Sequence, residues 1–142
     1  MKPSNPDFAA AVTNNFAQQP IMNLIGARLA RVEPGVVEIE LPFRADLTQQ
    51  DGYIHAGVLT TVADSAAGYA AYTLMPAGSR VLSIEFKVNL LRPARGELFI
   101  ARAEVIKAGR TLTVVRADVF ATSASSEKEL VATMQGTMMC LR

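Results

Sequence analysis

The sequence is poor in the residues that form disulfide bonds or metal sites, with one cysteine and one histidine among 142 residues. Cys140 has no partner for an internal disulfide, which is typical of a reducing cytoplasm, where we expect the protein to be located. A lone histidine and a lone cysteine, far apart in the sequence, are a poor ligand set, so we expect no metal. The N-terminus lacks the apolar run of a signal peptide, and no segment has the apolar length of a membrane span.

An excess of charge of one sign is also missing, because 14 basic side chains are balanced by 13 acidic ones. Proteins that bind nucleic acids normally carry a basic surplus, so we expect neither a nucleic acid nor a membrane as a partner. Half of the residues are apolar, and a chain of this length is sufficient for one hydrophobic core. We therefore predict a single domain over residues 1–142, in which residues 1–25 form an N-terminal helical segment.

The segment from Ala56 to Tyr72 predicts the central helix of the fold. It is rich in small and apolar residues, contains no helix breaker between Gly57 and Gly68, and has a single charged residue, Asp64. A helix without a charged face is normally buried on most sides, which would place this carboxylate among small apolar side chains. Such an acid can cap a helix, pair with a basic side chain or act in catalysis, and the helix alone does not distinguish these roles.

The residues just before this helix favour a catalytic site. His55 directly precedes the expected helix start, and the N–H groups of Ala56 and Gly57 would be among the unpaired donors of the first turn. Together with the positive end of the helix dipole, such donors can hold an oxyanion. For His55, a role in capping or packing is the alternative.

The rest of the chain has the pattern of β-strands, in which apolar and polar residues alternate. We predict strands at residues 28–32, 36–41, 82–90, 98–106, 111–120 and 130–141. Pro34-Gly35 is typical of a type II turn and predicts a hairpin, and a polar loop is expected at 123–128. Because a lone apolar helix must be covered, we predict an α+β fold in which an antiparallel sheet wraps around one long helix.

The order of Gln49, Gly52, His55-Ala56-Gly57 and Asp64 resembles the hotdog-fold acyl-CoA thioesterases, in their phenylacetate-pathway-like (PaaI-type) branch. The usual pattern of that branch is Asn-x-x-Gly-x-x-His-Gly-Gly, followed by an Asp in the central helix. The resemblance covers about residues 20–141. This chain has Gln49 in place of the Asn and Ala56 in place of the first Gly after the His. Both replacements keep the group that the family uses, a side-chain amide and a backbone N–H.

The resemblance implies a hotdog fold and the hydrolysis of acyl-CoA to a free acid and coenzyme A. No cofactor is implied, since coenzyme A is part of the substrate. Asp64 would act as a general base for water, or as a nucleophile that forms a mixed anhydride. The Ala56 N–H, helped by the Gly57 N–H, would hold the thioester oxygen.

Three further side chains belong to the expected catalytic site. Gln49 would orient water or the thioester, and His55 would position the loop rather than act as the base. Ser83 would donate a hydrogen bond to Asp64 or to the water. Ser83 lies on the polar side of the predicted strand 82–90, so a serine that faces solvent is the alternative.

Basic residues in turns are candidates for binding the phosphates of coenzyme A. Arginine matches the geometry of phosphate, and we predict that the basic side chains gather at one edge of the sheet. The alternative is a set of scattered, solvated turn residues. The four candidates are Arg92, Arg95, Lys107 and Arg110.

The resemblance also implies a homodimer with shared active sites, assembled as a dimer of dimers. The predicted strand 82–90 is long and regular, and an edge of this kind tends to pair with a second copy. Two other functions are compatible with the sequence, a dehydratase or hydratase of hydroxyacyl thioesters on the same fold and an acyl-CoA-binding protein without catalysis.

Overall fold

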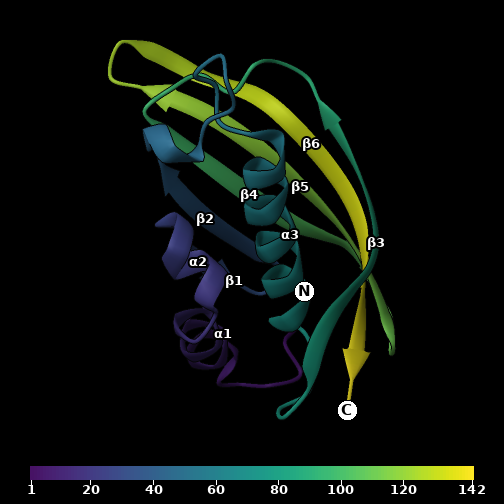
Figure 1. Ribbon diagram of the computed structural model, residues 1–142. Helices are drawn as coiled ribbons and strands as arrows, with labels where there is room; N and C mark the ends of the chain where they lie inside the picture. The colour runs from purple at the N-terminus through teal and green to yellow at the C-terminus, as the bar shows by residue number, and fades with distance from the viewer.

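The computed structural model describes residues 1–142, apart from the side chain of Ser126. One antiparallel sheet curves around a central helix (Figure 1). The elements are α1 (Phe8–Ala17), α2 (Pro20–Ile25), β1 (Arg28–Glu33), β2 (Val36–Pro42), the short 3₁₀ helix η1 (Ala45–Leu47), α3 (Ala56–Tyr72), β3 (Arg80–Leu90), β4 (Leu98–Ala108), β5 (Leu112–Ser123) and β6 (Ser126–Leu141). The strands lie in the order β1-β2-β4-β5-β6-β3, so the predicted fold class is confirmed.

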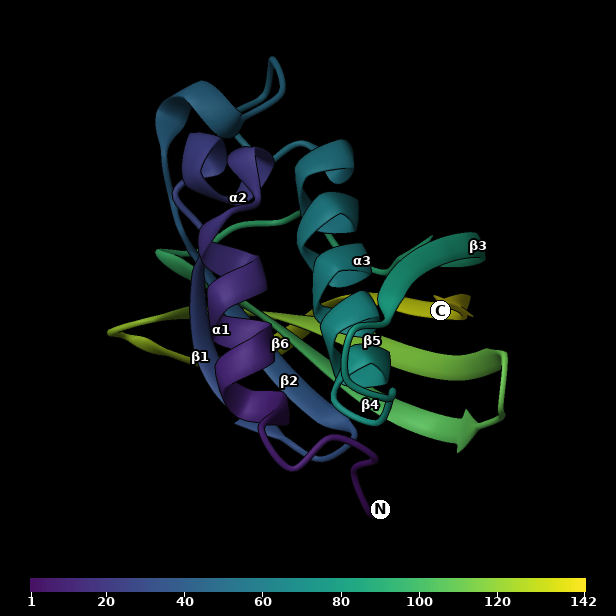
Figure 2. The same cartoon turned by 90° about the horizontal axis from the view of Figure 1, so that it is seen from below.

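The core lies between α3 and the concave face of the sheet. Leu59 and Val62 of α3 are almost completely buried, and the alanines further along the helix let it approach the strands closely. In β2, Val37 and Ile39 are fully buried and alternate with half-buried acids, as predicted. α1 and α2 lie beside α3, at the end of the sheet formed by β1 and β2 (Figure 2). No helix in the described part of the chain has both the length and the apolar character needed to cross a bilayer.

The expected helical segment at residues 1–25 contains two helices, and Pro20 is the first residue of α2, a position in which its missing N–H costs nothing. One boundary differs from the predictions. The polar loop predicted at 123–128 is instead a turn at 124–125, after which β6 begins at Ser126. Residues 127–129 are charged because both faces of the strand are exposed there, and this polarity hid the strand from the sequence pattern.

β3 contains a bulge that the sequence pattern did not predict. Ser83 pairs with Met138 and Glu85 pairs with Thr137, so Ile84 is an extra residue without a partner in β6. Directly paired residues lie on the same face of a sheet. Met138 is fully buried on the face toward α3, so Ser83 also faces α3. The predicted unbroken alternation, with Ser83 on the outer side, is therefore wrong.

Gly136 of β6 gives β3 the space that it needs just after the bulge. Phe86 pairs with Gly136, and a Cβ added to Gly136 would lie 3.0 Å from the carbonyl oxygen of Glu85. Because of the bulge, Phe86 shares the face of Ser83 although the two residues are an odd number of positions apart. The strand thus presents a polar side chain to α3 in its first half and apolar side chains to it in its second half.

β3 is an edge strand of the sheet, as predicted, and much of its apolar surface is exposed in the single chain. Four large apolar side chains of this strand are between 43% and 55% exposed. They are Leu82, Ile84, Phe86 and Leu90. A free edge next to exposed apolar side chains is typical of a surface that another chain covers.

Candidate active site

The start of α3 is capped by the imidazole of His55. Nδ1 of His55 accepts the N–H of Gly57 at 2.8 Å, so Nδ1 carries no proton in this arrangement. A Cβ on Gly57 would lie 3.0 Å from Nδ1, so a side chain at this position would crowd the imidazole of the cap. The Gly57 N–H is therefore occupied, and its predicted help in holding an oxyanion is not compatible with this cap. The Ala56 N–H has no acceptor among the described residues and remains available.

Gln49 folds back over its own loop. Its Oε1 accepts the backbone N–H groups of Asp51 at 2.5 Å and of Tyr53 at 3.3 Å. Gly52 makes this tight turn possible, because its φ of 84° lies in the left-handed region that favours glycine. The carbonyl oxygen of the Gln49 side chain thus holds the loop, and Gln49 also lines a cavity next to it.

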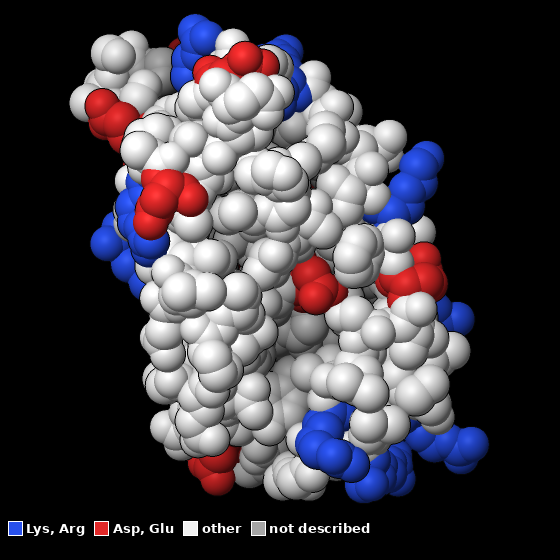
Figure 3. All heavy atoms as spheres, in the orientation of Figure 1, with Lys and Arg blue, Asp and Glu red and all other residues white. Residues whose placement is uncertain are grey.

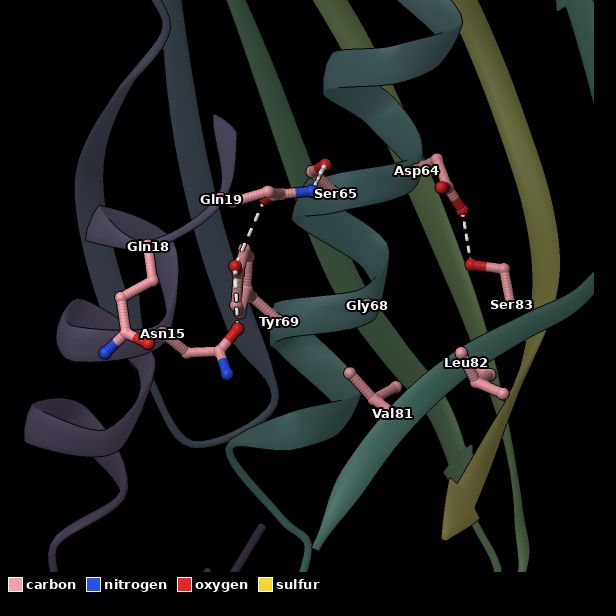
Figure 4. Close-up of a pocket in the computed structure, with 10 residues that line it drawn as sticks. All are labelled: Asn15, Gln18, Gln19, Asp64, Ser65, Gly68, Tyr69, Val81, Leu82 and Ser83. Atoms are coloured by element: carbon pink, nitrogen blue, oxygen red, sulfur yellow. Dashed lines mark hydrogen bonds between the residues drawn. The ribbon is translucent and has the colours of Figure 1, made fainter. Parts of the chain in front are cut away.

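Asp64 and Ser83 meet across the gap between α3 and β3. The Ser83 hydroxyl donates to Oδ1 of Asp64 at 2.5 Å, so the predicted hydrogen bond between them is present (Figure 4). The hydroxyl also lies 3.2 Å from the sulfur of Met138. The bulge in β3 is the reason for this contact, since it turns Ser83 toward the helix. With Oδ1 held in place, Oδ2 of the half-buried Asp64 is free to interact with a ligand.

Asp64 and Ser83 lie in a cleft of about 560 Å³ between α3, β3 and the junction of α1 and α2. The face over this cleft is hollowed and largely uncharged, with one acidic group in the hollow (Figure 3). The cleft is lined by Asn15, Gln18, Gln19, Asp64, Ser65, Gly68, Tyr69, Val81, Leu82 and Ser83. Only Asp64 and Ser83 among these residues were predicted to belong to the site.

Gln49 and Ala56 line a different cavity, of about 460 Å³, together with residues 90–94. Ala56 and Asp64 are eight positions apart on the same helix, which corresponds to about 12 Å along its axis. An atom that contacts Asp64 is therefore out of reach of the Ala56 N–H of the same chain. One chain brings the predicted site residues together only as two separate halves.

A polar network adjoins Asp64 and was not predicted. The hydroxyl of Tyr69 lies 3.0 Å from Oδ1 of Asn15 and 3.1 Å from Oε1 of Gln19. Nε2 of Gln19 in turn donates to the hydroxyl of Ser65 at 3.2 Å. Burial, with a smaller effect from Tyr72, raises the pKa of the Tyr69 phenol to about 12. Sequence patterns miss such a network, because it depends on how α1 packs against α3.

The four basic candidates do not form one cluster, and this prediction was wrong. Arg92 pairs with Glu129, and Arg95 lies over the ring of Tyr53 at 5.3 Å from its centre, all near the start of β4. Lys107 and Arg110 lie at the opposite end of this strand. An eleven-residue strand is about 33 Å long, so the two pairs cannot contact one phosphate group of a ligand within a single chain.

Comparison with known proteins places this geometry in a family. Residues 51–126 match the family model described as the thioesterase superfamily. A solved thioesterase family protein from Silicibacter pomeroyi is 50% identical, covers 94% of this chain and 98% of its own, and has a TM-score of 0.92. The PaaI protein of Escherichia coli, from the phenylacetic acid degradation operon, is 16% identical with a TM-score of 0.86 over 98% of this chain and 96% of its own, which shows the fold.

A relative whose substrate is named is the medium/long-chain acyl-CoA thioesterase YigI of Escherichia coli. It is 24% identical over 84% of this chain and 84% of its own length. The match of the family model, the similarity to a solved family member and the shared sheet-and-helix architecture agree with one another. The chain belongs to the thioesterase superfamily and has the hotdog fold.

Proposed function

We propose that this chain hydrolyses acyl-CoA thioesters to a free acid and coenzyme A in the cytoplasm. The observation that carries the proposal is the carboxylate of Asp64, held by Ser83 in an open and otherwise uncharged cleft. The superfamily supports thioester hydrolysis, and the name of the YigI relative supports coenzyme A as the thiol part of the substrate.

In the proposed reaction, Oδ2 of Asp64 takes a proton from a water molecule while the water oxygen attacks the thioester carbon. The Ala56 N–H stabilises the negative charge that develops on the carbonyl oxygen. The C–S bond then breaks, and the proton goes to the leaving sulfur to give free coenzyme A. In the alternative path, Asp64 attacks the carbon directly, the C–S bond breaks and the coenzyme A thiolate leaves. Water then hydrolyses the resulting anhydride to the free acid and the Asp64 carboxylate, and the proton that the water releases goes to the thiolate.

We further propose that each active site is shared between two chains. The distance of about 12 Å between Ala56 and Asp64 along the helix supports this proposal, in which the oxyanion donor and the acid come from different copies. The free edge of β3 offers a way to bring two copies together. Its stretch from Glu85 to Leu90 pairs regularly with β6, so the outer side of this stretch can continue the sheet into a partner. Two such dimers would form the expected tetramer.

Arg92 and Arg95 are the basic residues that we propose for binding the coenzyme A phosphates. They lie next to the cavity of Gln49 and Ala56, so they would adjoin the half-site that holds the thioester oxygen. Lys107 and Arg110 lie at the far end of β4, so we do not propose that they bind the same phosphates as Arg92 and Arg95 of their own chain.

The proposal predicts that Asp64→Asn removes thiol release from acyl-CoA and leaves the fold intact. Asparagine has nearly the same shape but cannot act as an anionic base or nucleophile, so kcat should fall at least about 100-fold, or about 2.7 kcal/mol. The assay is thiol release from a panel of acyl-CoAs, with circular dichroism as the check on folding. Asp7→Asn is the matched control, because Asp7 is exposed and does not line the cleft.

Three results would contradict this reading. An Asp64→Asn variant that keeps more than about a tenth of the wild-type kcat would assign the carboxylate a structural role, since the loss would be below about 1.4 kcal/mol. Addition or loss of water on the acyl group without thiol release would identify a hydratase or dehydratase. Tight retention of acyl-CoA without turnover would identify a binding protein.

A further inference from the structure

One wall of the Asp64 cleft has polar groups that the proposed hydrolysis does not use. This wall, which we call the amide wall, consists of Asn15, Gln18 and Gln19 at the junction of α1 and α2. Figure 4 shows the side chains of Asn15 and Gln19 on the opposite side of the cleft from Asp64, close to Tyr69. The Tyr69 hydroxyl has one proton and lies within reach of two amide oxygens, so it can donate to only one of them at a time.

The amide wall therefore has hydrogen-bonding capacity to spare. The side-chain amide of Gln18 and the NH₂ group of Asn15 have no protein partner among the described residues. The wall is also uncharged at neutral pH, because Asp64 and Tyr69 are the only ionisable side chains of the cleft and burial raises the pKa of Tyr69 to about 12. Side-chain amides both donate and accept, which matches a hydroxyl group, itself a donor and an acceptor.

Gly68 keeps a path open between Asp64 and the amide wall. It follows Asp64 by four positions and so lies on the same side of α3, about one turn further along. A Cβ added at Gly68 would meet no atom within 4 Å. Glycine in a helix interior costs about 0.5–1 kcal/mol relative to alanine, and here no close packing requires it. Its effect in this place is to leave room across the floor of the cleft (Figure 4).

Resting on the hydrolase activity proposed above, we propose that the amide wall selects acyl groups that carry a hydroxyl at the end away from the thioester. With the thioester at Asp64, the acyl chain crosses Gly68 and its hydroxyl meets Asn15, Gln18 and Gln19. In the single chain Asn15 and Gln18 are exposed and Gln19 is half-buried, so water can bind their amides. An alkyl group of the same length would displace this water without giving the amides a partner. A site built for hydrogen bonding rejects such an analogue more strongly than an apolar site rejects a missing methylene.

The test compares matched substrates in a thiol-release assay. The pairs are ω-hydroxyhexanoyl-CoA with hexanoyl-CoA, and ω-hydroxyoctanoyl-CoA with octanoyl-CoA. We expect kcat/KM to favour the hydroxylated member of at least one pair about tenfold or more. In the double variant Asn15→Leu with Gln18→Leu, this ratio should fall to about one. Asn14→Leu is the matched control, since Asn14 is an exposed neighbour on α1 that does not line the cleft.

The ratio is measured within each variant, so a loss of folded protein affects both substrates equally and cancels. Equal rates for the two members of both pairs, or a hydroxyl preference that survives in the double variant, would overturn the role of the amide wall while leaving the hydrolase proposal intact. If wild-type protein releases thiol neither from these substrates nor from the wider panel of acyl-CoAs, both proposals fail, whereas activity on the wider panel alone would overturn only the role of the amide wall. A preference that disappears in the Asn14→Leu control as well would also count against the amide wall.

Discussion

A shared active site makes a quantitative prediction for mixtures of two inactive variants. One chain carries Asp64→Asn, which removes the base or nucleophile. The other carries Gln49→Ala, which removes the side-chain oxygen that holds two backbone N–H groups of the loop before α3. Each variant alone should be nearly inactive, since every site in its dimers contains the lesion. The two variants are unfolded, mixed in equal amounts and refolded together.

The expected recovery follows from the distance of about 12 Å between the two halves of the site along α3. If Asp64 comes from one chain and Gln49 from the other, a mixed dimer contains one doubly damaged site and one intact site. Random association makes about half of the dimers mixed, so about a quarter of the wild-type activity should return. If both residues came from one chain, every site would keep one lesion and no activity would return.

The assay is thiol release at a fixed total concentration of chains, with a different affinity tag on each variant to show that mixed dimers form. Gln50→Ala replaces Gln49→Ala in the control mixture, because Gln50 is an exposed neighbour whose side chain bonds only to Asp51. That variant should be active on its own. Mixed dimers that can be isolated and remain inactive would refute the shared site, and with it the role assigned to the helix start.

Two further predictions concern single side chains of the cleft. Ser83→Ala removes the hydrogen bond to Asp64. Because such bonds to charged groups contribute about 1.5–3 kcal/mol, kcat should fall about 10- to 150-fold with little change in KM, whereas Ser83→Thr should keep most of the activity. An unchanged kcat in Ser83→Ala would rule out the orienting role. The Tyr69 phenol has a pKa of about 12 in the folded chain and of 10.0 in the unfolded chain. Its contribution to the free energy of unfolding is therefore fully present below pH 10 and is lost as the pH rises toward 12. The free energy of unfolding of the wild type should therefore fall relative to Tyr69→Phe by at most about 2–3 kcal/mol over this range, and parallel denaturation curves would contradict the prediction.

The central helix was predictable because its signals are local. The run of small and apolar residues from Ala56 to Tyr72 specifies a buried helix, and the helix has these bounds in the structure. His55 was open to two interpretations, and its position before the helix start agrees with the cap that the structure shows. The same cap occupies the Gly57 N–H, a consequence that depends on the rotamer of one side chain and so is not visible in the sequence.

The bulge in β3 was hidden for a different reason. Leu82, Ile84 and Phe86 are all apolar, so their spacing by two is compatible with an unbroken strand and contains no sign of an extra residue. The partner strand decides the matter, because Gly136 offers the space in which β3 can shift. Pairing between strands far apart in the sequence is non-local, and a period-two pattern in one strand does not contain it.

The separation of the basic residues, by contrast, could have been predicted. The predicted strand 98–106 lies between Arg95 and Lys107, and the two ends of a strand lie at opposite ends of a sheet. The amide wall could not, because nothing in residues 15–19 specifies which part of α3 they pack against. Contacts between α1 and α3 arise only when the whole chain has folded.

The extra residue in β3 also determines how a chain of this kind can diverge. In an unbroken strand, residues an odd number of positions apart lie on opposite faces. Ser83 and Phe86 are three positions apart, so in an unbroken strand of this sequence they would be locked to opposite faces. Ile84 removes that lock. Loss of its single codon would remove the bulge and still leave Ser83 opposite Met138, because Ser83 would then directly precede Glu85 and lie two positions before Phe86. A chain of this kind can therefore lose the bulge without separating the serine that holds the acid from the apolar stretch offered to a second copy.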